Sequence, residues 1–475
     1  MIDLLIEHAY VLTMTGEGAG VIQDGTVAAD GDKIVAVGKS LKIPRSYRGA
    51  RRKIDARGKA VLPGLIDAHT HTHFVGTRGE SQDIPESEWW TGVAPFSTYM
   101  TEDLAIKLAK LGIVEGIKAG TTLFGDFGPF MDAVAEKAYA KLGVRANLAT
   151  MFNELRAWYK GASESALYEF DPEVGKRGLR ENLQLIDRWQ GKVNGRITCC
   201  LGPQAPDMMS KDLLLETKRI ALERNLTMHF HLAQGATETA QMKARYGMSS
   251  IRFLDKIDFL CPNIMAVHCE SATDEELRLI AERGVRMISC PSIVAMTDGL
   301  VSPVWRYLEL GGRAAALGSD SSLTSSDMFK EVKMAALLNK VRSQDPTALP
   351  AWRALRLATI EAARTLGLEE TVGSIEPGKK ADLIVVDLTG QTIPILNRPI
   401  RNIVPNLVYS ADSAQVETVI VDGKIIMENR RILKIREDRI AQEAQKAAEQ
   451  LADNATNDYE AAGLRLSRWS KEGII

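Results

Sequence analysis

The sequence has few cysteines, little net charge and no apolar run of the roughly 18 residues needed to cross a bilayer. Its five cysteines lack CxxC spacing, which predicts reduced thiols and a cytoplasmic protein. The acidic N-terminal stretch is unlike a signal peptide. A formal charge of −2 gives no indication of a strongly basic surface of the kind that binds nucleic acid or anionic membranes. We therefore expect a small-molecule substrate as the partner, and neither nucleic acid nor a membrane.

Histidine is also scarce, and its distribution is the most informative feature of the sequence. Only seven histidines occur, and six of them fall into three tight groups. These groups are His69/His71/His73, His229/His231 and His268. Histidines scattered through a hydrophobic core would not cluster in this way, so the groups are the first candidates for a functional site. His8 stands apart, and we expect it to be an ordinary strand residue.

The apolar pattern divides the chain into four segments. Residues 1–60 contain short strands and turns, 61–371 alternate strands with amphipathic helices, 372–433 return to strands, and 434–475 form a helical extension. Because two β segments flank the middle one, we expect a small β-sandwich assembled from both chain ends. Within the first β segment, Lys53–Lys59 is expected to form a polar hairpin.

The middle segment predicts an α/β fold of the (β/α)8, TIM-barrel type. Eight strands alternate with helices such as Glu102–Lys118, and a glycine often ends a helix just before the next strand. A doubly wound open sheet is the alternative, but the sequence has no glycine-rich phosphate loop of the G-x-G-x-x-G kind to favour it. The expected strands are Gly64–Ala68, Thr121–Phe127, Val144–Thr150, Ile197–Leu201, Thr227–Leu232, Met265–His268, Val285–Cys290 and Ala314–Gly318.

His69 and His71 lie at the end of the first expected barrel strand. Alternate residues of a strand point to the same side, so both imidazoles can bind one ion. Imidazole suits zinc and its first-row neighbours. His231, His268 and Asp320 lie at the ends of the fifth, sixth and eighth expected strands. Because the carboxyl ends of barrel strands carry the active site in folds of this type, the sequence predicts a metal site at that rim.

Three stretches make the chain resemble the amidohydrolase superfamily, and within it the branch of S-adenosylhomocysteine/methylthioadenosine deaminases and atrazine chlorohydrolase. They are Pro63–His71, His229–His231 with His268, and Gly318–Asp320. The resemblance covers nearly the whole chain and implies a homo-oligomer. It also implies one divalent transition metal ion, with zinc expected and iron or cobalt as alternatives, and His268 beside the reactive water. The implied metal ligands are His69, His71, His231 and Asp320.

The fourth expected strand indicates one metal ion rather than two. Two-metal members of the superfamily use a bridging carboxylated lysine or a glutamate at the end of this strand. Here the strand and the residues after it read Ile197-Thr-Cys-Cys-Leu-Gly-Pro-Gln204, which contains neither.

A divalent ion lowers the pKa of a bound water from about 15.7 to roughly 7, which makes hydroxide available at neutral pH. We expect Asp320 to accept the water's proton and His268 to steady the tetrahedral adduct. The expected activity is hydrolysis of a non-peptide C–N bond, by deamination or amine removal, in a purine- or triazine-like heterocycle. A dechlorinase or an amide or urea hydrolase of the same superfamily is the close alternative. An inactive binding or scaffold protein on the same fold is the alternative from another class.

Two glutamines depart from the pattern of deaminases in this branch. The usual H-x-H-x-x-E motif ends here in Gln234, which cannot donate and retrieve a proton as a carboxyl does. Gln204 stands where purine deaminases tend to have histidine. Both are candidate substrate contacts, and Gln234 is also a candidate catalytic residue. Glu88 resembles the glutamate that contacts ribose hydroxyls in methylthioadenosine enzymes, with a surface acid as the alternative, and Trp89 can cover a planar ring.

Overall fold

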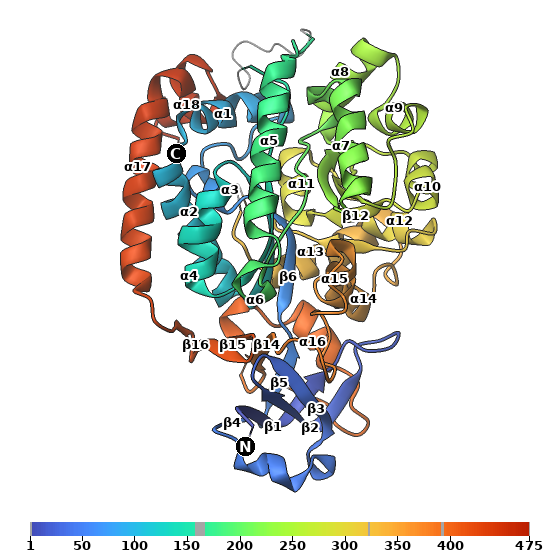
Figure 1. The fold of residues 1–475 in the computed structure, drawn as a ribbon, viewed down its shortest axis with the longest axis vertical. Coiled ribbons are helices and arrows are strands. Elements are labelled where there is room, and N and C mark those ends of the chain that lie inside the picture. Colours follow the sequence, from blue (N-terminus) through green and yellow to red (C-terminus); the bar gives the residue numbers. More distant parts are fainter. Residues whose placement is uncertain (1, 157–166, 322–323, 391–393, 475) are drawn as a thin grey trace.

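The computed structural model describes residues 2–156, 167–321, 324–390 and 394–474. An α/β body makes up most of the molecule, and a smaller sheet lies below it in Figure 1. Eight parallel strands form two four-stranded sheets at the centre of the body. The first sheet consists of β6 (Leu65–Thr70), β7 (Thr121–Gly128), β8 (Arg145–Thr150) and β9 (Ile197–Cys199), and the second of β10 (Met228–Leu232), β11 (Ile264–His268), β12 (Arg286–Ser289) and β13 (Ala315–Leu317).

The two parallel sheets are linked at both ends. Leu201, just beyond β9, pairs in parallel with Met228 of β10. At the other end, the backbone N–H of Asp320, just beyond β13, donates to the carbonyl of His69 in β6 at 2.9 Å. The last strand therefore lies beside the first. The α/β class is confirmed, and each of the eight predicted strands overlaps an observed one, with no end displaced by more than 2 residues.

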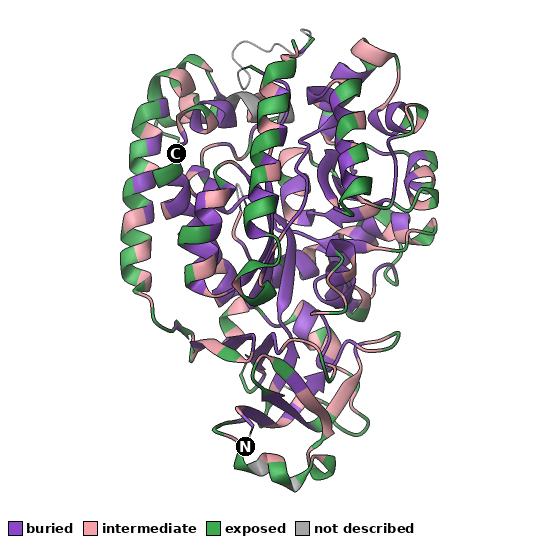
Figure 2. Cartoon of the chain, in the orientation of Figure 1, coloured by how far each residue is buried: buried purple, intermediate pink, exposed green. Residues whose placement is uncertain are grey.

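Both faces of the central strands are buried. Every residue of β6, β7, β10 and β11 is buried, as expected for parallel strands that are covered on both faces. Figure 2 shows the buried strands at the centre and exposed outer faces on the surrounding helices. The covering helix Glu102–Lys118 has its predicted bounds, and the Thr101 hydroxyl caps its first turn by accepting from the N–H of Leu104 at 3.4 Å.

Helices follow most of the strands and cover the outside of the body. They are α1 (Glu86–Tyr99), α2 (Glu102–Lys118), α3 (Met131–Val134), α4 (Ala140–Leu142), α5 (Pro172–Trp189), α6 (Lys192–Gly195), α7 (Lys211–Glu223), α8 (Gly235–Tyr246), α9 (Ser250–Lys256), α10 (Asp274–Glu282), α11 (Pro291–Thr297), α12 (Val304–Glu309), α13 (Met328–Ser343), α14 (Ala351–Arg356), α15 (Ile360–Leu366), α16 (Ile403–Tyr409), α17 (Glu437–Ala461) and α18 (Arg465–Lys471).

The smaller sheet contains strands from both ends of the chain, as the sequence predicts. Its nine strands run in the order β17-β16-β15-β14-β5-β1-β2-β3, with β4 also paired to β1. Because the pairing joins all nine into one sheet, the predicted β-sandwich stays a prediction. The strands are β1 (Leu4–Leu12), β2 (Val21–Asp30), β3 (Lys33–Lys39), β4 (Arg52–Asp55), β5 (Lys59–Pro63), β14 (Leu383–Asp387), β15 (Val416–Val421), β16 (Lys424–Glu428) and β17 (Arg431–Ile432).

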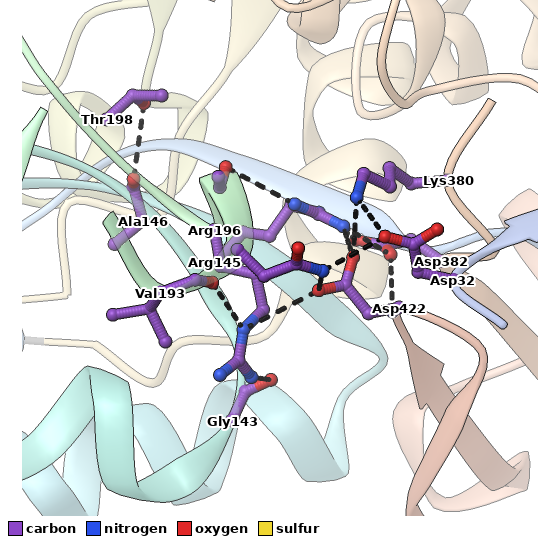
Figure 3. A network of polar contacts seen from close by, with 12 residues as sticks. Asp32, Gly143, Arg145, Ala146, Val193, Arg196, Thr198, Lys380, Asp382 and Asp422 are labelled. Atoms are coloured by element: carbon purple, nitrogen blue, oxygen red, sulfur yellow. Dashed lines mark hydrogen bonds and ion pairs between the residues drawn. The ribbon is translucent and has the colours of Figure 1, made fainter. Parts of the chain in front are cut away.

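Arg145, the first residue of β8, links the body to the smaller sheet. Its side chain is only 2% exposed and pairs with Asp382, just before β14, and Asp422, just after β15 (Figure 3). The Arg145 Nε donates to Asp382 Oδ2 at 2.5 Å. Lys380 and Arg196 lie within 3.9 Å and 3.7 Å of Asp422. The cationic groups thus balance the two buried carboxylates at the base of the body.

The C-terminal helix α17 runs along the side of the body, packed against α2 and α1 (Figure 1). Ala444, Ala447, Leu451 and Ala455 form the buried face of this helix. In the described parts of the chain, no helix is long and apolar enough to cross a membrane. All five cysteines are buried and carry free thiols.

Candidate metal centre

His69 and His71, at the carboxyl end of β6, converge on the carboxylate of Asp320. The Nε2 atoms of His69 and His71 lie 3.6 Å and 3.4 Å from Asp320 Oδ1. Asp320 follows β13 and is only 6% exposed. Its position is fixed by its own N–H, which donates to the carbonyl of His69. The three side chains therefore meet at the rim where the first and last strands lie side by side.

The rings of the three predicted histidine ligands are oriented by hydrogen bonds through Nδ1. The Nδ1 of His71 donates to the carbonyl of Phe127, and the Nδ1 of His231 donates to the carbonyl of Gln204 at 3.0 Å. His69 instead shares a hydrogen bond of 2.7 Å between its Nδ1 and the Nε2 of His229. A carbonyl can only accept, so the protons of His71 and His231 lie on Nδ1 and their Nε2 lone pairs are available to a metal ion.

The donor set fits one divalent metal ion. Ligand atoms of His69, His71 and His231 lie within 4.8 Å of one another, and so do those of His69, His268 and Asp320. Tetrahedral ligands about 2.1 Å from a zinc ion stand about 3.4 Å apart, which matches the separations of His69 and His71 from Asp320. The buried Nε2 of His69 has no hydrogen-bond partner among the described residues. A cation at this point satisfies that lone pair.

Burial keeps these imidazoles neutral. It lowers the pKa of His69 and His231 well below the usual value of 6.5, and neighbouring histidines lower it further. It also lowers the pKa of His229 to about 3 and that of His268 to about 4. Neutral imidazole is the form that binds metals, so His69 and His231 can accept a cation without first losing protons.

His268 lies at the end of β11, on the other side of Asp320. Its Nε2 is 3.6 Å from Asp320 Oδ2, and its own carbonyl accepts a hydrogen bond from Ser302 Oγ at 2.8 Å. The φ angles of His268 and Asp320 are 77° and 45°. Such left-handed conformations are costly for residues other than glycine and cluster at functional sites.

A hydrogen-bonded pair beneath the cluster holds the end of β13 in place. Ser319 donates its N–H to Asp67 Oδ1 at 2.8 Å and its hydroxyl to Asp67 Oδ2 at 2.5 Å. Burial raises the pKa of Asp67 to about 7 despite these bonds. The preceding residue must be glycine, because a Cβ on Gly318 would lie 2.7 Å from the carbonyl oxygen of His69. The backbone on both sides of Asp320 is thus fixed against β6.

A pocket opens beside this cluster. Its volume is about 340 Å³ with the open mouth included, and it is lined by Trp89, Gln234, His268, Glu270, Asp298 and Asp320 among others. Gln234 precedes α8, where Glu238 accepts hydrogen bonds from the N–H groups of Ala233 and Gln234 at 2.9 Å. The structure therefore brings Trp89 and Gln234 next to the predicted metal cluster.

Two predicted substrate contacts lie elsewhere. Gln204 is buried, and its Oε1 accepts from Asn153 Nδ2 at 2.5 Å. It approaches the centre only through its carbonyl, which orients His231. The Glu88 side chain accepts a hydrogen bond from the N–H of Arg465 at the start of α18. Neither Gln204 nor Glu88 is among the residues that line the pocket beside the cluster.

The structure adds two residues to which the sequence assigned no role. His229 supports His69, and its position two residues before His231 on the same strand was the available signal. Glu270 lines the pocket from the loop after β11. An acid two residues after a strand-end histidine is too common a pattern to single it out from the sequence.

Buried histidines and an aspartate at the carboxyl ends of parallel strands, next to a pocket, define a metal-dependent hydrolase. The chain belongs to the amidohydrolase family, whose model matches residues 60–426. A 5′-deoxyadenosine deaminase from Methanosarcina mazei is 36% identical over 95% of this chain and 99% of its own. A 5-methylthioadenosine/S-adenosylhomocysteine deaminase from Desulforudis audaxviator is 34% identical over 95% of this chain and 99% of its own. The solved structure of an adenosine deaminase from Xanthomonas campestris with bound zinc aligns with a TM-score of 0.84, at 28% identity over 95% and 99% of the two chains.

Proposed function

We propose that this hydrolase deaminates an adenosine derivative, using one divalent ion held by His69, His71, His231 and Asp320. The observation that carries the proposal is the approach of the His69 and His71 Nε2 atoms to the Asp320 carboxylate at 3.6 Å and 3.4 Å. Zinc is the proposed metal, because an adenosine deaminase of the same fold is known with zinc bound. When bound, such an ion makes a water molecule acidic enough to act as a nucleophile at neutral pH.

Asp320 and His268 are the proposed proton carriers around the attacked carbon. Asp320 accepts the proton of the attacking water and passes it to the leaving amine, because its carboxylate opens to the pocket as well as to the histidines. Burial keeps His268 neutral, so one ring nitrogen can donate a hydrogen bond to the developing oxyanion. Trp89 supplies an apolar face against which a planar ring packs.

The names of the relatives support the substrate class. Relatives that align over nearly their whole length act, by name, on 5′-deoxyadenosine, methylthioadenosine and S-adenosylhomocysteine. Gln234, in place of an acid, is the observation that favours the second candidate, removal of a better leaving group such as chloride from a triazine.

The test is an assay of a substrate panel with purified, metal-loaded protein. Adenosine, 5′-deoxyadenosine, methylthioadenosine, S-adenosylhomocysteine and a chlorotriazine are compared for release of ammonia or chloride, and bound metal is measured by mass spectrometry. We expect about one metal equivalent per chain and ammonia from at least one adenosine derivative, with activity lost on chelation and restored by zinc. Metal-loaded protein that releases ammonia from none of them contradicts the proposal, and chloride release alone favours the second candidate.

We also propose that β6 to β13 close into one (β/α)8 barrel. The Leu201–Met228 pair and the Asp320–His69 backbone hydrogen bond support closure, since they join the two sheets at both seams. The proposed domains keep the predicted boundaries. Residues 1–60 and 372–433 form the β domain, 61–371 the barrel and 434–475 the helical extension.

A further inference from the structure

Glu270 is a buried carboxyl group inside the pocket. It is 5% exposed, and both of its oxygens are shielded from water without a hydrogen-bond partner among the described residues. An ionised carboxylate in such surroundings has a large desolvation penalty, and buried polar groups in native proteins are nearly always paired. The arrangement therefore calls for a ligand or a chemical role.

The backbone fixes Glu270 beside Gln234. The residue before Glu270, Cys269, donates its N–H to the carbonyl of Leu232 at 3.1 Å. The residue after it, Ser271, donates its N–H to the carbonyl of Ala233, also at 3.1 Å. These two bonds align the loop after β11 with the loop after β10. Both side chains also line the same pocket.

The surroundings of Glu270 favour its neutral, protonated form. Burial raises its pKa well above 4.5, and the charge of the neighbouring Asp298 raises it further. The N–H groups of Glu270 and Gly235 oppose this effect weakly, but neither makes a hydrogen bond of normal geometry to the carboxyl. A protonated carboxyl is a hydrogen-bond and proton donor.

Neither metal binding nor a shared role with Asp298 accounts for the buried carboxyl of Glu270. Among the described residues, Glu270 belongs to neither group of ligand atoms that lie close enough to share an ion, so it is not placed to hold the metal. The other acid on that wall of the pocket, Asp298, is only partly buried and already accepts a hydrogen bond from Thr297. Glu270 is thus the carboxyl group of this pocket wall that stays protonated and can donate its proton.

We infer that Glu270 donates the proton that the ring nitrogen needs during hydrolysis, in place of a residue at position 234. The inference deepens the function proposed above and rests on it. It assigns Glu270 as a further catalytic residue and leaves Gln234 to orient the ring by hydrogen bonding.

The proton transfers balance over one turnover. As the water oxygen bonds to the amine-bearing carbon, the C=N electron pair moves to the ring nitrogen, which takes the proton of Glu270, while Asp320 takes a proton from the water. Asp320 then protonates the amine, the C–N bond breaks with its electron pair going to nitrogen, and ammonia leaves. The hydroxyl proton of the adduct returns to Glu270 as the new C=O bond forms. Both acids end in their starting states, so no further reactant is needed.

The test compares Glu270→Gln, Glu270→Asp and the double variant Glu270→Gln/Gln234→Glu with wild type on its best adenosine-type substrate. We expect Glu270→Gln to lower kcat by about 10²–10⁴-fold, the usual contribution of a general acid. KM, metal content and melting temperature should stay close to wild type. The kcat of Glu270→Asp should lie between those of wild type and Glu270→Gln, because aspartate keeps the acid but has a shorter side chain. The kcat of the double variant should be at least tenfold higher than that of Glu270→Gln, because the second substitution restores an acid at the neighbouring position.

Glu331→Gln is the matched control, since Glu331 is also a buried carboxyl but does not line the pocket. It should keep kcat within about threefold of wild type. The inference is overturned if Glu270→Gln keeps its kcat, loses its metal, changes KM alone, or is not improved by the second substitution. Wild-type protein that releases no ammonia from any adenosine derivative refutes the proposed function instead, so the two failures are distinguishable.

Discussion

The Nε2 of His229 and the Nδ1 of His69 are joined by a hydrogen bond of 2.7 Å. The other two predicted histidine ligands are oriented by backbone carbonyls, so His69 is the one whose orientation depends on a side chain. His229 is fully buried, and its ring stacks on Phe127 with centroids 5.1 Å apart. It therefore holds His69 in position from beneath the metal centre.

Replacing His229 should weaken metal binding without removing a ligand. We expect His229→Phe to reduce zinc affinity by about 10–100-fold, the usual effect of losing the partner that orients a metal-bound histidine. The measurement is competition with a chromogenic chelator at equilibrium. His8→Phe is the control, because His8 lies far from the site and pairs with the exposed Asp24. Equal affinities in wild type and His229→Phe would refute the supporting role.

Asp320 should be required for the metal to stay bound. Asp320→Asn keeps the size of the side chain but removes the charge that faces the His69 and His71 Nε2 atoms. We expect zinc affinity to fall by more than about 100-fold, beyond the effect of an outer partner, and deamination to fall with it. Metal content after gel filtration and ammonia release measure the two effects. Asp345→Asn, on the surface, should match wild type, and a fully metallated Asp320→Asn protein would contradict the ligand assignment.

The barrel-type body was predictable from the sequence because its signals are local. A strand such as β11 carries an apolar run from Ile264 to Val267, and a helix such as α2 carries its cap and its amphipathic face within its own residues. The hairpin expected at Lys53–Lys59 was wrong, since β4 and β5 each pair in parallel with β1 rather than with each other. Partners distant in the sequence decide that pairing, and no local pattern records them.

The metal cluster was predictable for a similar reason. The rule that strand ends share one rim needs only the strand positions, and these were correct for His69, His231 and Asp320. Of the predicted substrate contacts, Trp89 and Gln234 line the pocket and Gln204 and Glu88 do not. The positions of these residues depend on the loops that follow the strands. Gln204 is turned toward Asn153, and Glu88 accepts a hydrogen bond from Arg465 at the start of α18, 377 residues further along the chain. The unpaired state of Glu270 depends on what surrounds it in three dimensions, which the sequence alone does not encode.

Arg145 should be essential for stability. Arg145→Leu leaves Asp382 and Asp422 buried without their main counter-ion (Figure 3). Removing one partner of a buried ion pair costs about 3–5 kcal/mol, because the remaining charge stays desolvated. Urea-induced unfolding measures the loss. Arg51→Ala, which breaks an exposed pair with Asp3, should change stability by less than about 1 kcal/mol. If Arg145→Leu also lowers the free energy of unfolding by less than about 1 kcal/mol, the ion-pair network contributes little to stability.

Glu331 on α13 should make the protein less stable at alkaline pH. Burial raises its pKa to about 8, even though it accepts a hydrogen bond from the N–H of Ser292 at 3.1 Å. The unfolded chain loses this proton near the usual value of 4.5. Between these two values the unfolded state binds fewer protons than the folded state. The free energy of unfolding should therefore fall as pH rises, by at most about 1.4 kcal/mol per pH unit from this group.

Glu331→Gln removes the titrating proton but keeps the shape of the side chain. The variant should gain stability relative to wild type as the pH rises from 5 through 6.5 to 8, with the smallest difference at pH 5. Urea unfolding at the three pH values measures this difference, and Glu282→Gln on the exposed side of α10 should track wild type throughout. Groups far from Glu331 titrate alike in both proteins, so their contributions cancel in the comparison. A difference that stays constant over the three pH values would mean that Glu331 is ionised in the folded protein across the whole range.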